Sequence, residues 1–262
     1  MKRYFSLYFS LLKLSGSIFF SNRAYLASGI FTNTSWTFLV VIVTFAITSR
    51  SSMVLGWKRD ELLLLSTVYN VFLGIYYFLF NTNFRKLAHI ISFGELDMFL
   101  LKPIDSQFLL SFQEASYTDL IRTLLAIGLS TYFLIKMHIA VSALSLLEAC
   151  LLLICGLAIL YTLWFTIITI TIWFPQLSNL RDMLFHVNGI TRYPPQMFQH
   201  ASNILFFVLF PLTLIIVVPV KVLLQKAFFG DIVWLVFFSF FLLFLSRKFW
   251  KFALQFYTSA GG

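Results

Sequence analysis

Residues 24–49 read AYLASGIFTNTSWTFLVVIVTFAITS, and none of these 26 positions carries a charged side chain. An α-helix rises about 1.5 Å per residue, so about 20 apolar residues cross the hydrocarbon core of a bilayer, which is roughly 30 Å thick. This segment is long enough to do so. It therefore predicts a transmembrane helix in the first fifth of the chain.

The composition of the whole chain has the same character. Of its 262 residues, 60% are hydrophobic and only 11% are charged, and the mean hydropathy is +0.90. An average soluble domain carries roughly a quarter charged residues. A water-soluble globule of this length has too little polar material to cover so much apolar side chain. We therefore expect an all-α membrane protein whose solvent over much of its surface is lipid.

Five further apolar segments follow the first. We expect about six transmembrane helices, near residues 24–49, 61–80, 117–137, 142–174, 203–222 and 231–250. The third is short, because only 13 residues separate Arg122 from Lys136. Asp119 and Arg122 stand three apart and can pair on one helix face near the cytoplasmic interface. The functional alternative is a polar contact that lines a transport path.

The last two segments have features of their own. Pro211 and Pro219 lie inside the fifth, and each leaves a backbone carbonyl without its helical donor, so we expect a kinked helix. The sixth is framed by Asp231 and Arg247. Arg247 and Lys248 are expected to lengthen it by reaching outward to the lipid headgroups.

The N-terminal segment, residues 1–22, has a polar stripe at helical spacing. The stripe lies opposite an apolar face, which predicts an amphipathic helix on the cytoplasmic membrane surface. A cleaved signal peptide is a poorer interpretation, because Lys13 interrupts the apolar stretch and no small-x-small site follows cleanly. The stripe is Lys2, Ser6, Ser10, Lys13 and Ser17; the apolar face is Phe5, Tyr8, Leu12 and Phe19.

The basic residues indicate the orientation. A net charge of +9 would suggest nucleic acid in a soluble protein, but these residues lie between apolar segments, which fits anionic lipid headgroups better, so we expect no nucleic-acid partner. With the N-terminus inside, thirteen basic residues fall on the cytoplasmic side and six outside, so both termini are expected in the cytoplasm. The thirteen are Lys2, Arg3, Lys13, Arg23, Arg85, Lys86, Lys102, Arg122, Arg181, Arg192, Arg247, Lys248 and Lys251; the six are Arg50, Lys58, Arg59, Lys136, Lys221 and Lys226.

Residues 81–108, NTNFRKLAHIISFGELDMFLLKPIDSQF, mix apolar and charged side chains between the second and third segments. Apolar positions such as Leu87, Ile90, Ile91 and Phe93 must be buried against something. The membrane surface is one candidate, and a groove on a soluble partner is the functional alternative, because helix-in-groove binding uses the same kind of apolar anchors.

Catalytic motifs are missing from the sequence. No phosphate-binding loop of the Gly-x-x-x-x-Gly-Lys-Ser/Thr type occurs. The four histidines, His89, His138, His186 and His200, are scattered, and Cys150 and Cys155 lie in one apolar run without metal-ligand spacing. We therefore expect no catalytic, cofactor-binding or metal site in this chain. We find neither an internal repeat nor a flexible linker, so residues 1–262 are interpreted as one membrane domain.

The 81–108 segment resembles a known family. Gly94-Glu-Leu-Asp97 followed by Leu100-Leu-Lys-Pro103 is similar to a stretch of the ABC-2 type transporter permeases, in a branch of exporter transmembrane subunits. The other matching places follow in the expected order over nearly the whole chain: Gly56-Trp57, Arg192-Tyr-Pro194, Pro211, Pro219 and Tyr257-Thr-Ser-Ala-Gly261. Pro194-Pro195 departs from the pattern, in which a single proline is expected.

The resemblance implies a permease in the inner membrane of a bacterial cell. This permease would pair with a second permease, identical or related, and with two ABC ATPase subunits in the cytosol. ATP and Mg²⁺ would be bound by the partner ATPase. The first cytoplasmic loop, residues 81–108, would carry the coupling helix that docks on the ATPase. The residues implied in coupling are Arg85, Lys86, Glu95, Asp97 and Lys102.

The expected function is therefore that of the membrane subunit of an ATP-driven exporter, itself not an enzyme. A shortage of charge inside the membrane and 33 phenylalanines favour an amphipathic substrate over a free ion. Two alternatives remain open. One is an ion-coupled secondary transporter, for which Glu148 and Asp119 are the only nearby ionisable candidates. The other is an integral-membrane enzyme or a scaffold for assembling another complex.

Overall fold

The computed structural model describes residues 2–49, 53–54, 56–174 and 203–258. Almost all of these residues are helical. The helices are α1 (Lys2–Ser21), α2 (Arg23–Thr48), α3 (Arg59–Tyr76), α4 (Thr82–Ser92), α5 (Asp97–Leu100), α6 (Ser106–Ser111), α7 (Tyr117–Lys136), α8 (Ala143–Ile170), α10 (Asn203–Leu223) and α11 (Phe229–Ala253), with a π-helical turn at Tyr77–Asn81 and a 3-10 turn at Leu254–Phe256.

Several sequence predictions concern other residues. Outside the described residues lie Arg50, Arg181, Arg192, His186 and His200, the Arg192–Pro195 motif and the end of the Tyr257–Gly261 motif. The side chains of Lys2, Arg3 and Pro211 are likewise not described. These predictions stay predictions.

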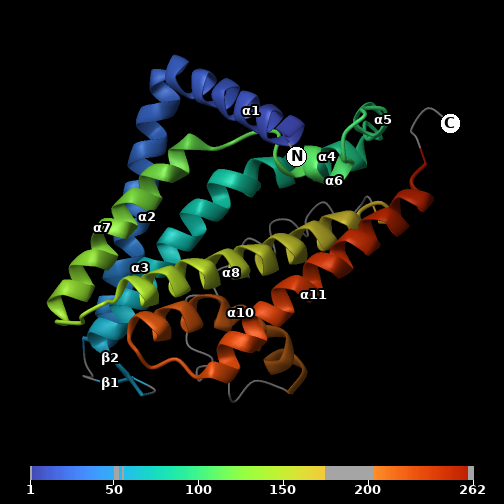
Figure 1. Ribbon diagram of the computed structural model, residues 1–262. Coiled ribbons are helices and arrows are strands. Elements are labelled where there is room, and N and C mark those ends of the chain that lie inside the picture. The colour runs from blue at the N-terminus through green and yellow to red at the C-terminus, as the bar shows by residue number, and fades with distance from the viewer. Residues whose placement is uncertain (1, 50–52, 55, 175–202, 259–262) are drawn as a thin grey trace.

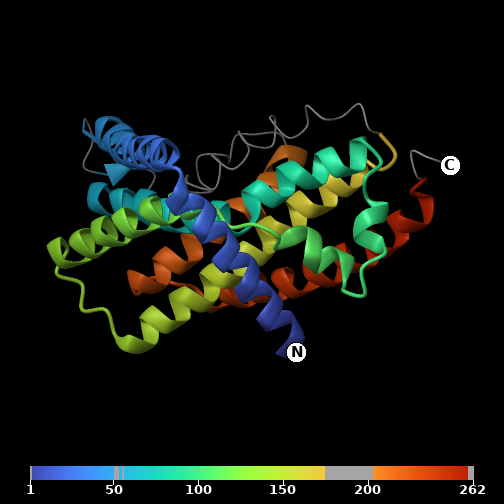
Figure 2. The ribbon, with the colours of Figure 1, turned by 90° about the horizontal axis from the view of Figure 1, so that it is seen from above.

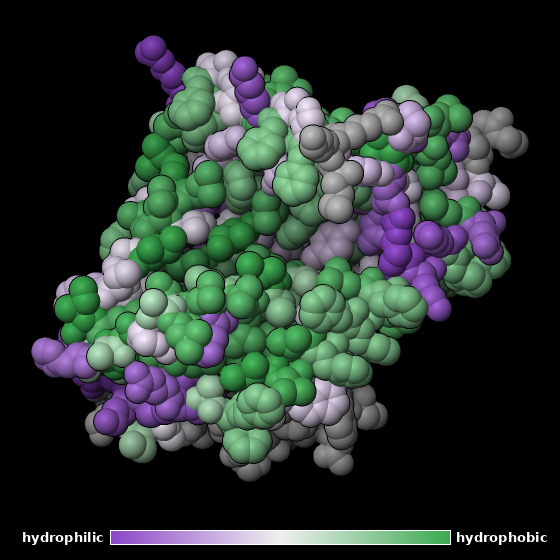
Figure 3. Space-filling view, in the orientation of Figure 1, coloured by the Kyte–Doolittle hydropathy of each residue, from purple (hydrophilic) through white to green (hydrophobic). Residues whose placement is uncertain are grey.

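Five helices in the described part of the chain are long and apolar enough to cross a membrane: Arg23–Thr48, Arg59–Ser92, Tyr117–Lys136, Ala143–Ile170 and Phe229–Phe256. α10 covers the fifth predicted segment, and its Leu212–Leu223 part is a shorter apolar helix. The prediction of an all-α membrane protein is confirmed, and the sixth crossing stays a prediction. Figure 3 shows hydrophobic side chains over the middle of the molecule and hydrophilic ones toward its ends.

The second predicted segment does not end where we expected it to. Instead of a loop from residue 81, one helix continues from Arg59 to Ser92 through the π-helical turn Tyr77–Asn81. The sequence holds no glycine or proline between Gly74 and Ser92 to stop it. Asn83 lies just after the π-helical turn and ties it to a distant segment: its Nδ2 donates both to Leu79 O and to Glu114 O, each at 2.8 Å. A π turn of this kind re-aims the helix that follows it.

The three connections α2–α3, α7–α8 and α10–α11 meet at one end of the bundle. Lys136 Nζ donates to Asp60 Oδ1 at 2.8 Å, and Lys226 Nζ donates to Glu61 Oε1 at 2.5 Å. Arg59 donates to the carbonyls of Thr48 and Ser49, at the negative end of the α2 dipole. We call this group of residues the loop end. The small hairpin of β1 (Met53–Val54) and β2 (Trp57–Lys58) lies there too (Figure 1).

The hairpin gives a physical reason for the Gly56-Trp57 pair. Gly56 has a φ of +84°, in the left-handed region that glycine adopts without steric cost. The turn it makes delivers Trp57 into the core, where the side chain is buried. The opposite end of the bundle holds α1, α4, α5, α6 and the C-terminal end of α11 (Figure 1).

Helix α3 forms the centre of the molecule. In the most apolar stretch of the helix that begins with α3, 78% of the residues are buried, against 11% in α2 and 17% in the helix that contains α11. Two glycines allow close packing in the core. A Cβ at Gly74 would lie 2.2 Å from Thr123 Oγ1 of α7, and a Cβ at Gly156 of α8 would lie 2.5 Å from Ile215 Cγ2 of α10.

Candidate coupling site

The apolar face of α4 is buried inside the protein. Leu87, Ile90 and Ile91 are all buried, and the ring of Phe84 lies 5.7 Å from that of Tyr161 on α8. Neither alternative that we considered for these residues, the membrane surface or a partner's groove, is therefore correct. The fourth residue of that set, Phe93, is different, because its side chain is 63% exposed.

The Gly94-Glu-Leu-Asp97 motif forms the end of α4. Gly94 has a φ of +70°, Gly94 N–H donates to Ile91 O at 3.2 Å, and Glu95 N–H donates to Ile90 O at 2.9 Å. These two bonds make a Schellman cap, which terminates a helix on a left-handed residue. Leu96 is completely buried and anchors the turn, while Glu95 stays exposed.

Residues 93–103 project from the α4 end as a compact segment, which we call the coupling tip. Its apolar side chains Met98 and Leu101 are 61% and 85% exposed, alongside Phe93. Lys102 Nζ lies 5.0 Å from the centre of the Phe99 ring. Exposed apolar side chains interleaved with charge are typical of a protein-binding surface. Figure 1 shows α5 at the same end of the molecule as the C-terminal end of α11.

The five predicted coupling residues divide into two groups. Glu95, Asp97 and Lys102 lie in the coupling tip, whereas Arg85 and Lys86 lie on the exposed face of α4. Lys86 forms an ion pair with Glu114, in the segment that leads to α7. Asp97 is half-buried beside Tyr257: burial first, and the Asp97 charge second, raise the pKa of the Tyr257 phenol.

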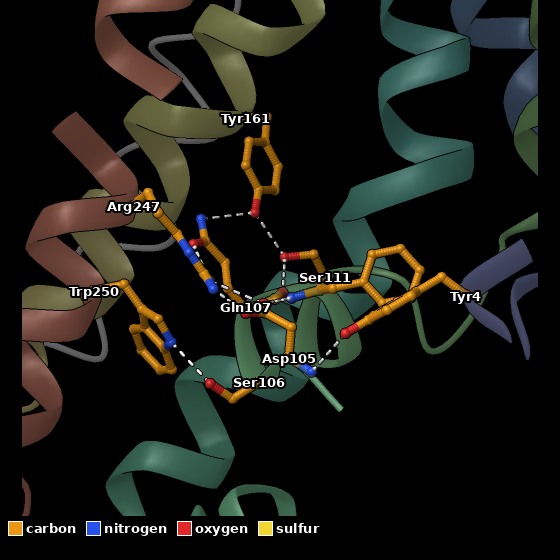
Figure 4. A network of polar contacts seen from close by, with 9 residues as sticks. Tyr4, Asp105, Ser106, Gln107, Ser111, Tyr161, Arg247 and Trp250 are labelled. Atoms are coloured by element: carbon orange, nitrogen blue, oxygen red, sulfur yellow. Dashed lines mark hydrogen bonds and ion pairs between the residues drawn. The ribbon is translucent and has the colours of Figure 1, made fainter. Parts of the chain in front are cut away.

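Helix α6 ties the coupling tip to the membrane helices. Asp105 caps α6, because its Oδ1 accepts from Phe108 N–H at 2.9 Å. Arg247 of α11 forms an ion pair with Asp105 and donates to Gln107 Oε1 at 3.0 Å. We call the α6 hub the network of Asp105, Ser106, Gln107 and Ser111 with Tyr4, Tyr161, Arg247 and Trp250 (Figure 4).

The remaining contacts of the α6 hub reach three other helices. Gln107 Nε2 donates to Tyr161 Oη at 3.2 Å, and Ser111 Oγ lies 2.9 Å from the same hydroxyl. Trp250 Nε1 donates to Ser106 Oγ at 3.1 Å. One six-residue helix is thus bonded to α8 and α11, and Figure 4 shows Tyr4 of α1 beside it.

The electrostatics of the α6 hub favour a charged Asp105. Partial burial on its own raises the pKa of this carboxyl, but the hydrogen bond from Arg247, the N–H of Phe108 and the charge of Arg247 together outweigh it. The pKa of Asp105 therefore lies below its usual value. The carboxylate stays ionised at any pH near neutrality.

Arg247 has protein partners that we did not predict, because its guanidinium donates to Asp105 and Gln107. Its contact with lipid headgroups stays a prediction. Lys248, the other residue of that prediction, has its Nζ 4.6 Å from the centre of the Phe244 ring. The partners of Arg247 lie 140 and 142 residues away in the sequence, so no local pattern indicates them. An Asp in N-cap position before a short apolar helix was the one available signal.

Helix α1 packs against the segment between α6 and α7 with part of the face that we assigned to the membrane. Tyr8 lies edge-on to Phe112 at 5.6 Å, and Phe19 stacks on Tyr117 at 5.8 Å. Tyr117 Oη also donates to Leu12 O at 2.9 Å. Phe5 differs, being 64% exposed. The side chains of Tyr8 and Phe19, two of the four residues of the predicted apolar face, thus contact protein. Figure 2 shows α1 crossing diagonally over the other helices.

Arg122 has a partner that the sequence did not indicate. Its side chain is buried between α3 and α7, and its Nε and Nη2 donate to Asn70 Oδ1 at 2.9 and 2.6 Å. Asp119 instead accepts from Ser116 Oγ at 2.5 Å. The geometry thus favours a structural role for Arg122 over a position on a transport path. Within the residues that the structure describes, no cluster of three or more His, Cys, Asp or Glu side chains could hold a metal ion.

Comparison with known protein families gives a match over most of the chain. The model of the ABC-2 family transporter proteins matches residues 33–261, which include most of α2, the four later candidate spanning helices and the coupling tip. No curated protein and no solved structure matches the chain.

Proposed function

Because the chain belongs to the ABC-2 family of transporter proteins, we propose that it is the transmembrane permease subunit of an ATP-binding cassette exporter. It works as a non-catalytic subunit. ATP and Mg²⁺ bind to ATPase subunits on separate polypeptides, and a second permease, identical or related, completes the translocation path.

The observation that carries this proposal is the shape of the coupling tip. Phe93, Met98 and Leu101 are exposed at the end of the molecule that lies farthest from the loop end, on a turn held by the Schellman cap. A mobile loop would lose much of its binding free energy to ordering, whereas a pre-formed turn does not. Three apolar anchors next to the charges of Glu95 and Lys102 suit a groove on an ATPase subunit.

The α6 hub supplies the path by which docking affects the membrane. ATP-driven closure of the ATPase pair moves the coupling tip, and α6 follows because it lies directly behind the tip in the chain. The bonds of α6 to Tyr161 and Arg247 pass that movement to α8 and α11. ATP acts only through the difference in its affinity for the inward and outward states.

The proposed setting is a bacterial inner membrane, with both termini and the coupling tip in the cytoplasm. The excess of basic residues on that side supports this orientation. The loop end, with its pairs Lys136–Asp60 and Lys226–Glu61, then faces outward.

Substitution in the coupling tip tests the proposal. The tagged chain is purified in mild detergent from its native membrane, and the ATP hydrolysis that copurifies is measured. Leu101→Asp should reduce this activity at least about tenfold, because a carboxylate replaces a buried apolar anchor in the complex. Ala140→Asp, which places the same charge on an exposed position at the loop end, should leave it unchanged.

Two results count against the proposal. One is a wild-type chain that carries no ATP-hydrolysing subunit at all. The other is equal copurifying activity in the Leu101→Asp and Ala140→Asp variants.

A further inference from the structure

A long groove runs between α7 and α8, with α3 as its floor. Its volume is about 1010 Å³, at the upper end of the roughly 300–1,000 Å³ of small-molecule sites. Its lining is apolar along most of its length, with Val68 and Ile75 on the floor and Leu153 and Leu157 on one wall. The rims, Ile127 of α7 and Ile154 of α8, are exposed, so the groove opens sideways from the bundle. Figure 3 shows this hollow between hydrophobic walls.

The polar side chains of the groove that are not bonded within their own helix lie at one end. The hydroxyls of Ser130 and Thr131 bond to carbonyls of their own helix, Ala126 O and Gly128 O, at 2.8 Å each. The other polar lining residues, Asp105, Gln107, Tyr161 and Arg247, belong to the α6 hub. An apolar slot with polar groups at one end suits a ligand that has an acyl chain and a polar headgroup.

The α6 hub still has hydrogen-bonding capacity for such a headgroup. A guanidinium has five N–H donors, and three bonds from Arg247 are formed within the described part of the chain. The Asp105 side chain accepts three bonds, whereas a carboxylate offers about four lone-pair sites. The side chains of Arg247 and Asp105 are 39% and 28% exposed. Both signs of charge are therefore accessible at the end of the groove.

We propose that the groove holds a membrane phospholipid with an ethanolamine headgroup, its acyl chain between α7 and α8, its phosphate on Arg247 and its ammonium group facing Asp105. The rims lie on helices long and apolar enough to span the membrane, where lipid is the surrounding solvent. A zwitterionic headgroup complements the ion pair at both of its charges. A phosphatidylglycerol headgroup has the same phosphate charge but no ammonium group to face the Asp105 carboxylate. The site does not depend on the exporter function or on an ATPase.

The experiment is native mass spectrometry of the delipidated, detergent-purified chain, titrated with phosphatidylethanolamine or phosphatidylglycerol. Wild-type protein should retain one phosphatidylethanolamine and bind phosphatidylglycerol about tenfold more weakly. Ala158→Trp fills the groove and should abolish retention. Ala46→Trp makes the same change on an exposed face of α2 outside the groove and should retain the lipid as wild type does.

A second set of variants tests the headgroup contact. Arg247→Gln should lower phosphatidylethanolamine affinity about tenfold, the effect of one lost charge-assisted hydrogen bond. Lys248→Gln removes the next charge on the same helix and should lower it much less. In a Cys155→Ser background, Cys150, which lines the groove, should be alkylated more slowly once phosphatidylethanolamine is added.

Three results would overturn the inference. They are equal lipid retention by Ala158→Trp and Ala46→Trp, equal binding of the two lipids by wild type, and alkylation of Cys150 at a rate that lipid does not change. A dimer that appears in the same spectra and is lost in Ala158→Trp without any bound lipid would assign the groove to a second copy of the chain.

Discussion

Arg247 and Asp105 illustrate how one partly buried contact changes the interpretation of a charge near a membrane. A lone arginine in the last turns of a spanning helix is expected to extend to headgroups. Here the nearest carboxylate is already held in place as the N-cap of α6, so the guanidinium finds a pre-organised partner. The pair joins the segment behind the coupling tip to α11.

This pair should make stability depend on pH in a defined window. The folded state lowers the pKa of Asp105 below the usual value of about 3.9, so the carboxylate contributes stability above that value and loses it as the pH falls through the lowered pKa. Asp105→Asn keeps the N-cap and removes the charge. The wild type should melt at a higher temperature than Asp105→Asn from pH 7 down to about pH 5, and the difference should shrink below about pH 4.

Differential scanning fluorimetry in detergent measures both proteins over this range. A melting difference that persists unchanged to pH 3 would show that the charge of Asp105 contributes nothing. A difference already lost at pH 6 would contradict the direction of the pKa shift.

Arg122 and Asn70 form a second residue-level contact, inside the bundle. Removing the arginine leaves the fully buried Asn70 oxygen without its donor. We expect Arg122→Leu to lower the free energy of unfolding by about 2–3 kcal/mol, the range of hydrogen bonds to charged groups. Arg122→Leu combined with Asn70→Leu should cost less than the sum of the two single substitutions.

Denaturant titration of the purified protein gives these energies. Strict additivity of the two substitutions would refute the contact. Thr131→Val, on an exposed position of the same helix, serves as the control for a polar-to-apolar change.

At the scale of elements, the coupling tip depends on how α4 ends. Gly94 takes a left-handed conformation that costs other residues about 1–2 kcal/mol. Gly94→Ala should therefore destabilise the Schellman cap and reduce the copurifying ATPase activity several-fold. Gly128→Ala, in the regular helix α7 with open space around the new methyl, should leave activity and stability unchanged or slightly improved.

The measurement is the same copurifying ATP hydrolysis, together with the melting temperature of each variant. If Gly94→Ala matches Gly128→Ala in both, the rigid cap plays no part in coupling.

Elements are also the scale at which the sequence was most informative. Uncharged runs such as residues 24–49 predict helices directly, because the period and length of the apolar pattern are local properties. The junction at Tyr77–Asn81 was not predictable in this way. Whether a polar Asn83 ends a helix depends on Glu114, whose carbonyl it reaches across 31 residues.

The candidate site was predictable only in part, for the same reason. The family resemblance directed attention to Glu95, Asp97 and Lys102, and the structure places them in one exposed segment. The sequence could not indicate that Leu87 and Ile90 are core residues. An amphipathic helix has the same spacing of apolar residues whether its apolar face packs on lipid, on a partner or on its own protein. The α6 hub joins residues from four helices, and no local period predicts such contacts.

At the scale of the whole molecule, bonds at both ends of the bundle join elements that are distant in the sequence. The α6 hub joins α6 to α8 and α11 at one end, and Lys226–Glu61 joins the α10–α11 connection to α3 at the loop end. Between these ends lies the groove of α7 and α8. A movement imposed on the coupling tip therefore acts on α8 and α11 through a few named bonds.

The most direct test of this account is photo-crosslinking in living cells from position 101. Leu101 is replaced by a photoreactive phenylalanine analogue, and Ala140 carries the same analogue in a control. The account predicts that irradiation links position 101, and not position 140, to a subunit that binds and hydrolyses ATP. It is contradicted if position 101 yields no such product, or if it is labelled from outside the cell by a reagent that cannot cross the membrane.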